Sequence, residues 1–327
     1  MDVTPPRPAD DAPPRPADDA PPHSADDAPP RAAGPVRALP HPAGPVRALP
    51  VVLAAAVVAL QIAYPLVPIG PARDRLTVVI VAVFAAASVT HALLWRGPRF
   101  AAALVATTTL GGLAVEVVGV HTGWPFGSYR YTGSLGLQVL GVPVVVALAW
   151  TMMAYPAYVV SEVIGGGIVR RTLVGGWALA AWDLFLDPQM VREGHWQWQG
   201  SAWELAGIPL SNHLAWFAVA TVMLAALRAA TGLVPAHAAT TGRSAGAATA
   251  ADAATAGALD DRVPLTLYVW TFASSVLAHA VFFGLPMSAL TGGVGMGVVV
   301  VALLRALRSA PPDRAGRREV RPVARRG

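Results

Sequence analysis

Three acidic residues lie inside otherwise apolar stretches of the chain, where a charge is costly. Glu116 lies in the run LAVEVVGV, and Asp183 and Asp187 lie in WDLFLDPQM. An ionised carboxylate in the hydrocarbon of a membrane costs on the order of 3 kcal/mol, so it needs a partner, a proton or a chemical role. These three residues are therefore the candidates for catalysis.

The spacing of the two aspartates predicts that they act together. Residues four apart in a helix lie on one face, so Asp183 and Asp187 should be about one turn apart. Repulsion should leave one of the two protonated near neutral pH, as a general acid requires. Asp183 is the deeper residue and is predicted to be the acid, with Asp187 orienting water and Glu116 facing the pair. The alternative is a hydrated pair at the end of a helix.

Aromatic residues are dense beside these acids. Such rings can form a wall that holds a polyene and stabilises a carbocation through the negative faces of the rings. The alternative is the belt of Trp and Tyr that membrane proteins place at the water interface. The candidates for substrate binding are Trp124, Tyr129, Tyr131, Trp182, Trp196 and Trp198, with His121 and Asn212 as polar members. Asn212 or Ser211 has the alternative role of a helix N-cap.

The composition excludes several kinds of chemistry. The chain has no Cys, so disulfides, thiolate nucleophiles and Cys-ligated metals are excluded. It also has no Lys, which excludes a Schiff-base lysine and a phosphate-binding P-loop lysine. No His has a second His three to five residues away, and no glycine motif opens a nucleotide-binding helix. We therefore expect neither a metal nor an organic cofactor.

The elements that must position these residues are membrane-spanning helices. Of the 327 residues, 54% are hydrophobic and only 13% are charged, and the mean hydropathy is +0.51. Apolar stretches long enough to cross a bilayer occur near residues 51–69, 76–95, 101–120, 139–162, 172–187, 207–229, 263–283 and 286–307. The fifth is short and acidic at its end. The sequence therefore predicts an all-α, polytopic helical membrane protein with seven or eight spans.

The distribution of Arg predicts how the chain sits in the cell membrane. Most Arg residues fall on one side when both termini are placed in the cytoplasm, as the positive-inside rule requires. In this orientation the loops 121–138 and 188–206 share the outer face. Residues 1–50, with Pro/Ala/Asp repeats, are predicted to be a disordered tail, and 51–307 the transmembrane domain with a flexible loop at 232–262. The Arg-rich tail 308–327 is expected to bind anionic lipid rather than nucleic acid.

Three segments together resemble a known family. EVVGVHTGWPFGSYRYTG at 116–133, WDLFLDPQM with GHWQW within 182–198, and GIPLSNHLAWF at 207–217 are similar to the membrane-integral carotenoid biosynthesis hydratases, which include carotenoid 1,2-hydratases and bisanhydrobacterioruberin hydratase. The resemblance implies addition of water to the terminal double bond of an acyclic carotenoid, giving a tertiary alcohol without redox change or organic cofactor. It also implies membrane lipid and other enzymes of the carotenoid pathway as partners.

Two other functions are compatible with the same residues. The spacing of Asp183 and Asp187 also occurs in the Asp-rich motif of intramembrane prenyltransferases, including lycopene elongases, which binds Mg²⁺-diphosphate. The chain has no second motif of this kind. A non-enzymatic carotenoid-binding membrane helper would keep the aromatic residues without needing the carboxylates.

Overall fold

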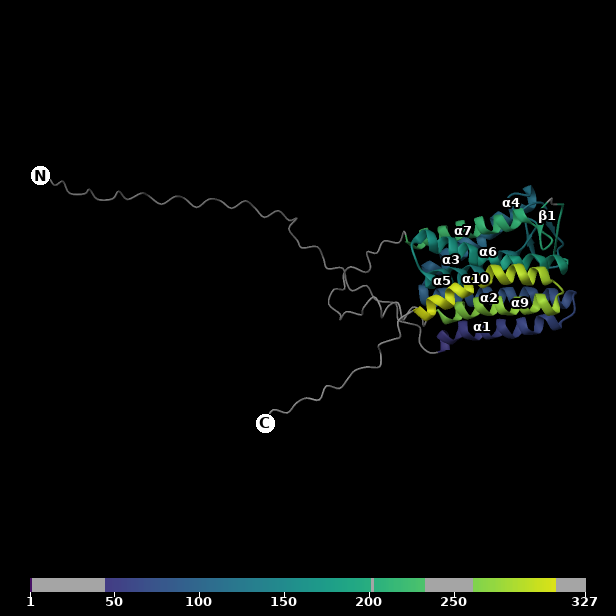
Figure 1. Ribbon diagram of the computed structural model, residues 1–327, viewed down its shortest axis with the longest axis horizontal. Helices are drawn as coiled ribbons and strands as arrows, with labels where there is room; N and C mark the ends of the chain where they lie inside the picture. Colours follow the sequence, from purple (N-terminus) through teal and green to yellow (C-terminus); the bar gives the residue numbers. More distant parts are fainter. Residues whose placement is uncertain (2–44, 201–202, 233–260, 310–327) are drawn as a thin grey trace, which may run out of the picture. The chain divides into compact units, whose positions relative to one another are not determined.

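The computed structural model describes Met1 and residues 45–200, 203–232 and 261–309. Residues 45–200, 203–232 and 261–309 form a bundle of long helices that run side by side, with the strand β1 at one end (Figure 1). The helices are α1 (Pro45–Ala63), α2 (Pro71–Arg96), α3 (Pro98–Leu104), α4 (Gly111–Thr122), α5 (Val144–Ile164), α6 (Ile168–Arg192), α7 (Leu210–Gly232), α9 (Arg262–Leu277) and α10 (Pro286–Ser309). Short helical segments extend three of them: η1 (Tyr64–Leu66), η2 (Val105–Leu110) and η4 (Ala278–Phe282).

Seven of the helical stretches in the described residues are long and apolar enough to cross a membrane. The helix α6 is also long, at 25 residues, but it carries Arg and Asp residues along its length. It packs against α5, α7 and α10. The prediction of an all-α polytopic membrane protein with seven or eight spans is confirmed.

Some predicted boundaries differ from the structure. Helix α1 begins at Pro45, inside the predicted tail 1–50, because Pro is well tolerated in the first turn of a helix. Helix α6 continues through Pro188, where a loop was predicted. Pro188 cannot donate to the carbonyl of Leu184, and the Ser288 hydroxyl donates to that oxygen instead, at 2.7 Å.

Several predicted segments fall largely outside the described residues. These are the tail 1–50, of which 2–44 are not described, the loop 232–262 and the tail 308–327.

The loops at one end of the bundle are joined by strand pairing. β1 (Tyr129–Tyr131) pairs antiparallel with β4 (Trp196–Trp198), so that Tyr129 lies opposite Trp198 and Tyr131 opposite Trp196. Since these strands belong to the loops 121–138 and 188–206, the two loops lie at the same end of the bundle, as predicted. Two short hairpins follow: β2 (Gln138–Val139) with β3 (Val142–Pro143), and β5 (Glu204–Leu205) with β6 (Ile208–Pro209).

The central part of the fold is an internal repeat. The order α4, β1, β2, β3, α5 recurs as α6, β4, β5, β6, α7. Both hairpins turn through two residues of positive φ, Leu140–Gly141 (50° and 83°) and Ala206–Gly207 (55° and 80°), as a type I′ turn requires. The motif G-[VI]-P followed by L-A-W occurs in both segments. In this correspondence, Glu116 is equivalent to Asp183 and Trp150 to Trp216.

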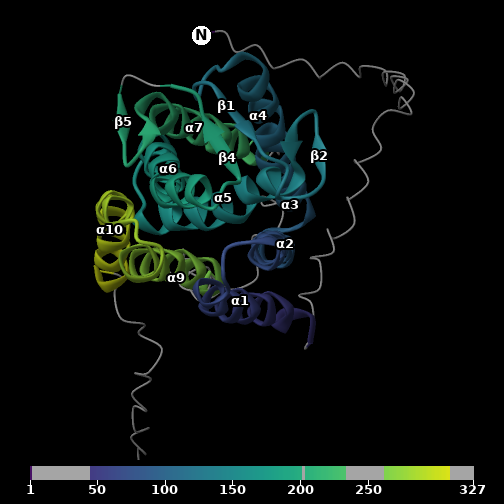
Figure 2. The same cartoon turned by 90° about the vertical axis from the view of Figure 1, so that its right-hand side faces the viewer.

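The repeat forms the larger of two groups of helices. Figure 2 looks along the bundle and shows α3/α4, α5, α6 and α7 grouped together, with α10, α9, α1 and α2 along one side. The contacts agree, because α2 and α9 pack against α5 and α10 packs against α6. The candidate acids therefore lie on helices of the repeat.

Candidate active site

The two aspartates of α6 share one hydrogen-bond donor. The side-chain nitrogen of Asn212 donates to Oδ2 of Asp183 at 3.1 Å and also to Oδ2 of Asp187. Both aspartates are buried, with 0% and 4% of their surface exposed. Because one nitrogen contacts both carboxyl groups, the prediction that they lie on one face of a helix is confirmed.

Asn212 does not lie at the N-cap of a helix, which was the alternative role for this residue. Helix α7 begins at Leu210, so Asn212 and Ser211 lie within the helix and not at its N-cap. The Ser211 hydroxyl donates to the carbonyl of Phe126 at 3.1 Å. Asn212 is thus a bridge between α7 and the acids of α6.

The two carboxyl groups differ in their other contacts. Oδ1 of Asp187 accepts from the Trp196 indole at 3.1 Å. Nδ1 of His213 lies 3.3 Å from Oδ2 of Asp183. Oδ1 of Asp183 has no hydrogen-bond partner in the described part of the chain. The deeper aspartate is therefore the less completely satisfied of the two.

Glu116 accepts hydrogen bonds from three donors, all in the first segment of the repeat (α4 to α5). Its Oε2 accepts from the hydroxyls of Tyr129 at 2.5 Å and Tyr131 at 2.9 Å, and its Oε1 accepts from the Trp150 indole at 3.1 Å. Burial first, and then the negative charge of Glu116, raise the pKa of Tyr129 and of Tyr131 above the ordinary value. Both phenols therefore remain protonated donors.

Two glycines of α4 make room for this arrangement. A Cβ at Gly119 would lie 2.7 Å from the Tyr129 hydroxyl, and a Cβ at Gly112 would lie 2.7 Å from the Trp150 ring. Gly112, Glu116 and Gly119 share one face of the helix. The small residues thus let both rings approach the carboxylate.

Two of the three acids, Glu116 and Asp187, open onto one cavity of about 150 Å³. Glu116, Asp187 and Asn212 line it, together with an aromatic wall of Phe126, Tyr129, Tyr131, Trp150, Trp182, Trp196, Trp198 and Trp216. Asp183 is not among the lining residues, although it lies one helical turn from Asp187 in α6. Asp187, rather than Asp183, is therefore placed where it can reach a molecule in the cavity.

The aromatic wall is ordered by ring contacts. Trp150 stacks on Trp216, with ring centroids 3.9 Å apart and planes 10° from parallel. Tyr129 contacts Trp198 at 4.9 Å, and Tyr131 meets Trp196 edge to face at 5.6 Å, following the pairing of β1 with β4. Faces of several rings near one point can stabilise positive charge.

Two candidates for substrate binding lie away from the cavity. Trp124 is 71% exposed. His121 is also exposed, and its Nδ1 donates to the carbonyl of Val117 on the same helix at 2.8 Å. Trp182, Tyr129, Tyr131, Trp196, Trp198 and Asn212 do line the cavity. No group of three His, Cys, Asp or Glu suited to a metal ion occurs in the described residues.

Sequence reasoning missed the stacked pair Trp150 and Trp216. Both lie within apolar helices, where an aromatic residue is usually a packing residue. The signal that could have found them is the repeated L-A-W at 148–150 and 214–216.

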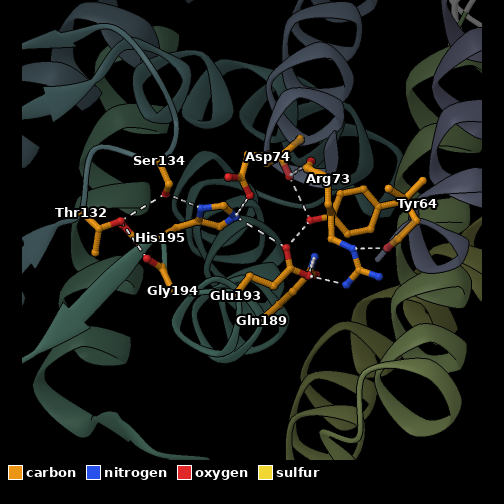
Figure 3. A network of polar contacts seen from close by, with 11 residues as sticks. Tyr64, Arg73, Asp74, Thr132, Ser134, Gln189, Glu193, Gly194 and His195 are labelled. Carbon is orange, nitrogen blue, oxygen red and sulfur yellow. Dashed lines mark hydrogen bonds and ion pairs between the residues drawn. The ribbon is translucent and has the colours of Figure 1, made fainter. Parts of the chain in front are cut away.

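A second polar cluster lies beside the cavity, around Glu193 (Figure 3). Glu193 accepts from the Tyr64 hydroxyl at 2.5 Å and from Arg73 at 3.3 Å, and Nε2 of His195 lies 3.5 Å from it. The Nδ1 atom of His195 contacts the hydroxyl of Ser134 at 2.7 Å. This Glu193 cluster fastens η1 and α2 to the end of α6, and Tyr64 lines the cavity.

The chain is similar to known proteins of carotenoid biosynthesis. The model of a family described as "Carotenoid biosynthesis protein" matches residues 76–255. Over 123 residues the chain is 33% identical to the bisanhydrobacterioruberin hydratase of Haloarcula japonica, covering 36% of this chain and 41% of that protein. The match thus spans less than half of the relative. No solved structure matches the chain.

Proposed function

The chain belongs to the carotenoid biosynthesis protein family, and from that premise we propose that it adds water to the terminal double bond of an acyclic carotenoid. The product is a tertiary alcohol, and the reaction is an acid-catalysed hydration without redox change. The named hydratase among its relatives supports the reaction class.

One observation carries the proposal: a buried carboxyl pair bridged by Asn212 meets a third carboxyl, Glu116, at one aromatic-lined cavity. A protein that only bound a polyene would need the rings and not the acids. Burying three carboxyl groups is costly, so the presence of two of them at one cavity, with the third one helical turn away, favours a chemical role.

The mechanism begins with proton transfer from Asp187. Two carboxyl groups that share one donor at close range do not both ionise readily, so the pair holds a proton that Asp187 can donate. The proton forms a C–H bond with the less substituted alkene carbon. Positive charge then develops on the tertiary carbon, beside the ring faces of the aromatic wall.

Water completes the reaction. Its oxygen forms the C–O bond with the tertiary carbon and loses one proton to the carboxylate of Asp187, which restores the acid. Glu116, on the other segment of the repeat, is suited to stabilise the cation by its charge and to orient the water. Asp183 acts through Asp187 and Asn212, since it does not line the cavity. It is a positioning residue in this scheme.

The test is expression of the chain in a host that accumulates lycopene. Mass spectrometry of the pigments should show a gain of one water per reacted end, and growth in ¹⁸O-labelled water should place the label in the new hydroxyl. The matched control is Asp187→Asn at equal membrane abundance. Unchanged lycopene with the parent chain, in cells where the protein is present and binds pigment, would favour the binding helper.

A further inference from the structure

The side of the cavity away from the acids carries polar residues that the hydration does not use. Thr271, Ser275 and His279 line it from α9 and η4, and Gln61 and Thr77 line it from α1 and α2. Thr271, Ser275 and His279 follow one another at intervals of four residues, so they form a row along one helix face. A hydrocarbon chain gains nothing from such a row.

The hydrogen bonds around His279 determine which of its nitrogens is free. The Ser288 hydroxyl donates its only proton to the carbonyl of Leu184 at 2.7 Å. Towards Nδ1 of His279, 2.9 Å away, Ser288 therefore acts as an acceptor, and Nδ1 carries the proton. In the neutral imidazole, Nε2 is then an acceptor.

This acceptor is buried without a donor. His279 is 1% exposed, and Nε2 has no hydrogen-bond partner among the described residues. Its ring is held between Phe185 and Phe283, with centroids at 5.1 Å and 5.4 Å. Leaving a buried polar atom unpaired is costly, so a ligand that donates to it gains affinity.

Two further features on this side of the cavity are typical of a ligand-binding site. The hydroxyl oxygen of Thr271, which is 3% exposed, also has no partner in the described part of the chain. His279 belongs to η4, a single π-helical turn, and such turns occur often at functional sites.

We propose that the α9 side of the cavity is a binding site for a hydroxyl group, which donates its hydrogen to Nε2 of His279. Two sources share this chemistry: an alcohol group carried by the substrate near its reactive end, and a water molecule. The first source rests on the proposed carotenoid substrate. The second needs only that the cavity is hydrated on this side.

Two substitutions at His279 separate the ligand contact from packing. His279→Asn keeps a group near Nδ1 that can donate to Ser288, but has nothing at the position of Nε2. His279→Gln places its carbonyl oxygen near Nε2 and loses the bond to Ser288. A ligand site predicts that Gln functions and Asn does not, whereas a purely structural histidine predicts the reverse.

The binding probes are linalool and its deoxygenated analogue, which share the branched alkene end of an acyclic carotenoid and differ by one hydroxyl. Each is measured by displacement of lycopene from the purified protein, followed by polyene absorption. For a substrate alcohol, the parent and Gln variant should bind linalool about tenfold more tightly than the analogue, and the Asn variant should lose this preference.

For a bound water, neither probe is preferred, but lycopene hydration falls in the Asn variant and not in the Gln variant. The proposal is overturned if the Gln variant is impaired as much as the Asn variant or more, or if both variants match the parent in binding and turnover. Lycopene binding without hydration by the parent would instead count against the proposed function, and the probe comparison would still test the hydroxyl site.

Discussion

Trp150 and Trp216 occupy equivalent positions in the two segments of the repeat and stack face to face at 3.9 Å. Glu116 and Asp183 are likewise equivalent, but their surroundings have diverged. Glu116 is held by the donors of its own segment, whereas Asp183 has acquired a second acid one turn on, Asp187, and the bridging Asn212. At the positions of Asp187 and Asn212, the first segment has Val120 and Val146. The two segments therefore have distinct parts in one site.

The divergence predicts unequal effects of removing the two aspartates. Asp187→Asn keeps the size of the side chain and one of its two acceptor oxygens but removes the transferable proton, and should lower hydration by at least ~100-fold. Asp183→Asn leaves the proton donor in place and should cost about tenfold. Both are measured as conversion of lycopene at equal protein abundance. Near-parental conversion by the Asp187 variant would refute the role of its carboxyl group.

Glu116 is expected to matter through its charge rather than through folding alone. Glu116→Gln keeps one acceptor oxygen for the Trp150 indole and places an amide nitrogen that can donate to the Tyr129 oxygen. It removes the negative charge beside the developing cation, and should lower turnover by ~100-fold or more. Binding of lycopene, followed by its absorption spectrum, should be retained. Tyr131→Phe removes one of three donors and is the milder comparison. Equal activity of Glu116→Gln and the parent would mean that the charge has no part in the reaction.

Trp150 links the two segments of the repeat, because its indole donates to Glu116 and its ring stacks on Trp216. Trp150→Phe removes the indole donor to Glu116 and reduces the area stacked on Trp216, which should destabilise the protein by about 1–3 kcal/mol. Trp124→Phe, at an exposed ring, is the matched control and should leave both stability and turnover close to the parent. Thermal unfolding in detergent provides the measurement. A loss as large at Trp124 as at Trp150 would contradict the assignment.

The parts of the fold that follow from local pattern were predictable. Apolar length identifies the spans, and a four-residue spacing places Asp183 and Asp187 on one face. Alternation in YRY would likewise place Tyr129 and Tyr131 on one face of a strand, and alternation in WQW would do the same for Trp196 and Trp198. These features depend on residues close in sequence.

The rest depends on contacts between distant segments. Trp198 lines the cavity because β4 pairs with β1, whereas Trp124 lies outside both strands and is exposed. Since both residues are Trp, the residue type alone does not distinguish them. The continuation of α6 through Pro188 depends on Ser288, which is far along the chain. The reach of Asp187 rather than Asp183 into the cavity depends on how α6 packs against its neighbours. No local pattern contains this information.

The orientation in the membrane is predicted from Arg asymmetry and from the common end of the two loops. Reporters inserted after Gly133 and after Gly200 should both lie outside, because β1 and β4 pair at one end of the bundle. Reporters in the 232–262 segment and after Gly327 should lie in the cytoplasm. Activity of paired phosphatase and fluorescent reporters gives the measurement. A cytoplasmic signal after Gly133 would reverse the orientation.

The Glu193 cluster should make the stability of the protein depend on pH. Burial raises the pKa of Glu193, but the His195 ring at 3.5 Å, the hydrogen bond from Tyr64 and the charge of Arg73 outweigh it, so the pKa lies below the ordinary value. A carboxylate with a lowered pKa stabilises the folded state above the unfolded pKa of about 4.3, and this stabilisation is lost as the pH falls through the lower, folded value. The Glu193 cluster should therefore hold η1 and α2 less firmly at low pH.

Glu193→Gln tests this, since it removes the charge and keeps the shape. At pH 7 the variant should be less stable than the parent by about 2 kcal/mol, the usual worth of hydrogen bonds to a charged group. The difference should shrink as the pH is lowered from about 5 towards 3, because the parent loses the same charge by protonation. The control is Glu204→Gln, at an exposed position of β5, which should follow the parent at every pH. A difference between Glu193→Gln and the parent that stays constant across this pH range would show that the ionised form of Glu193 does not hold the cluster together.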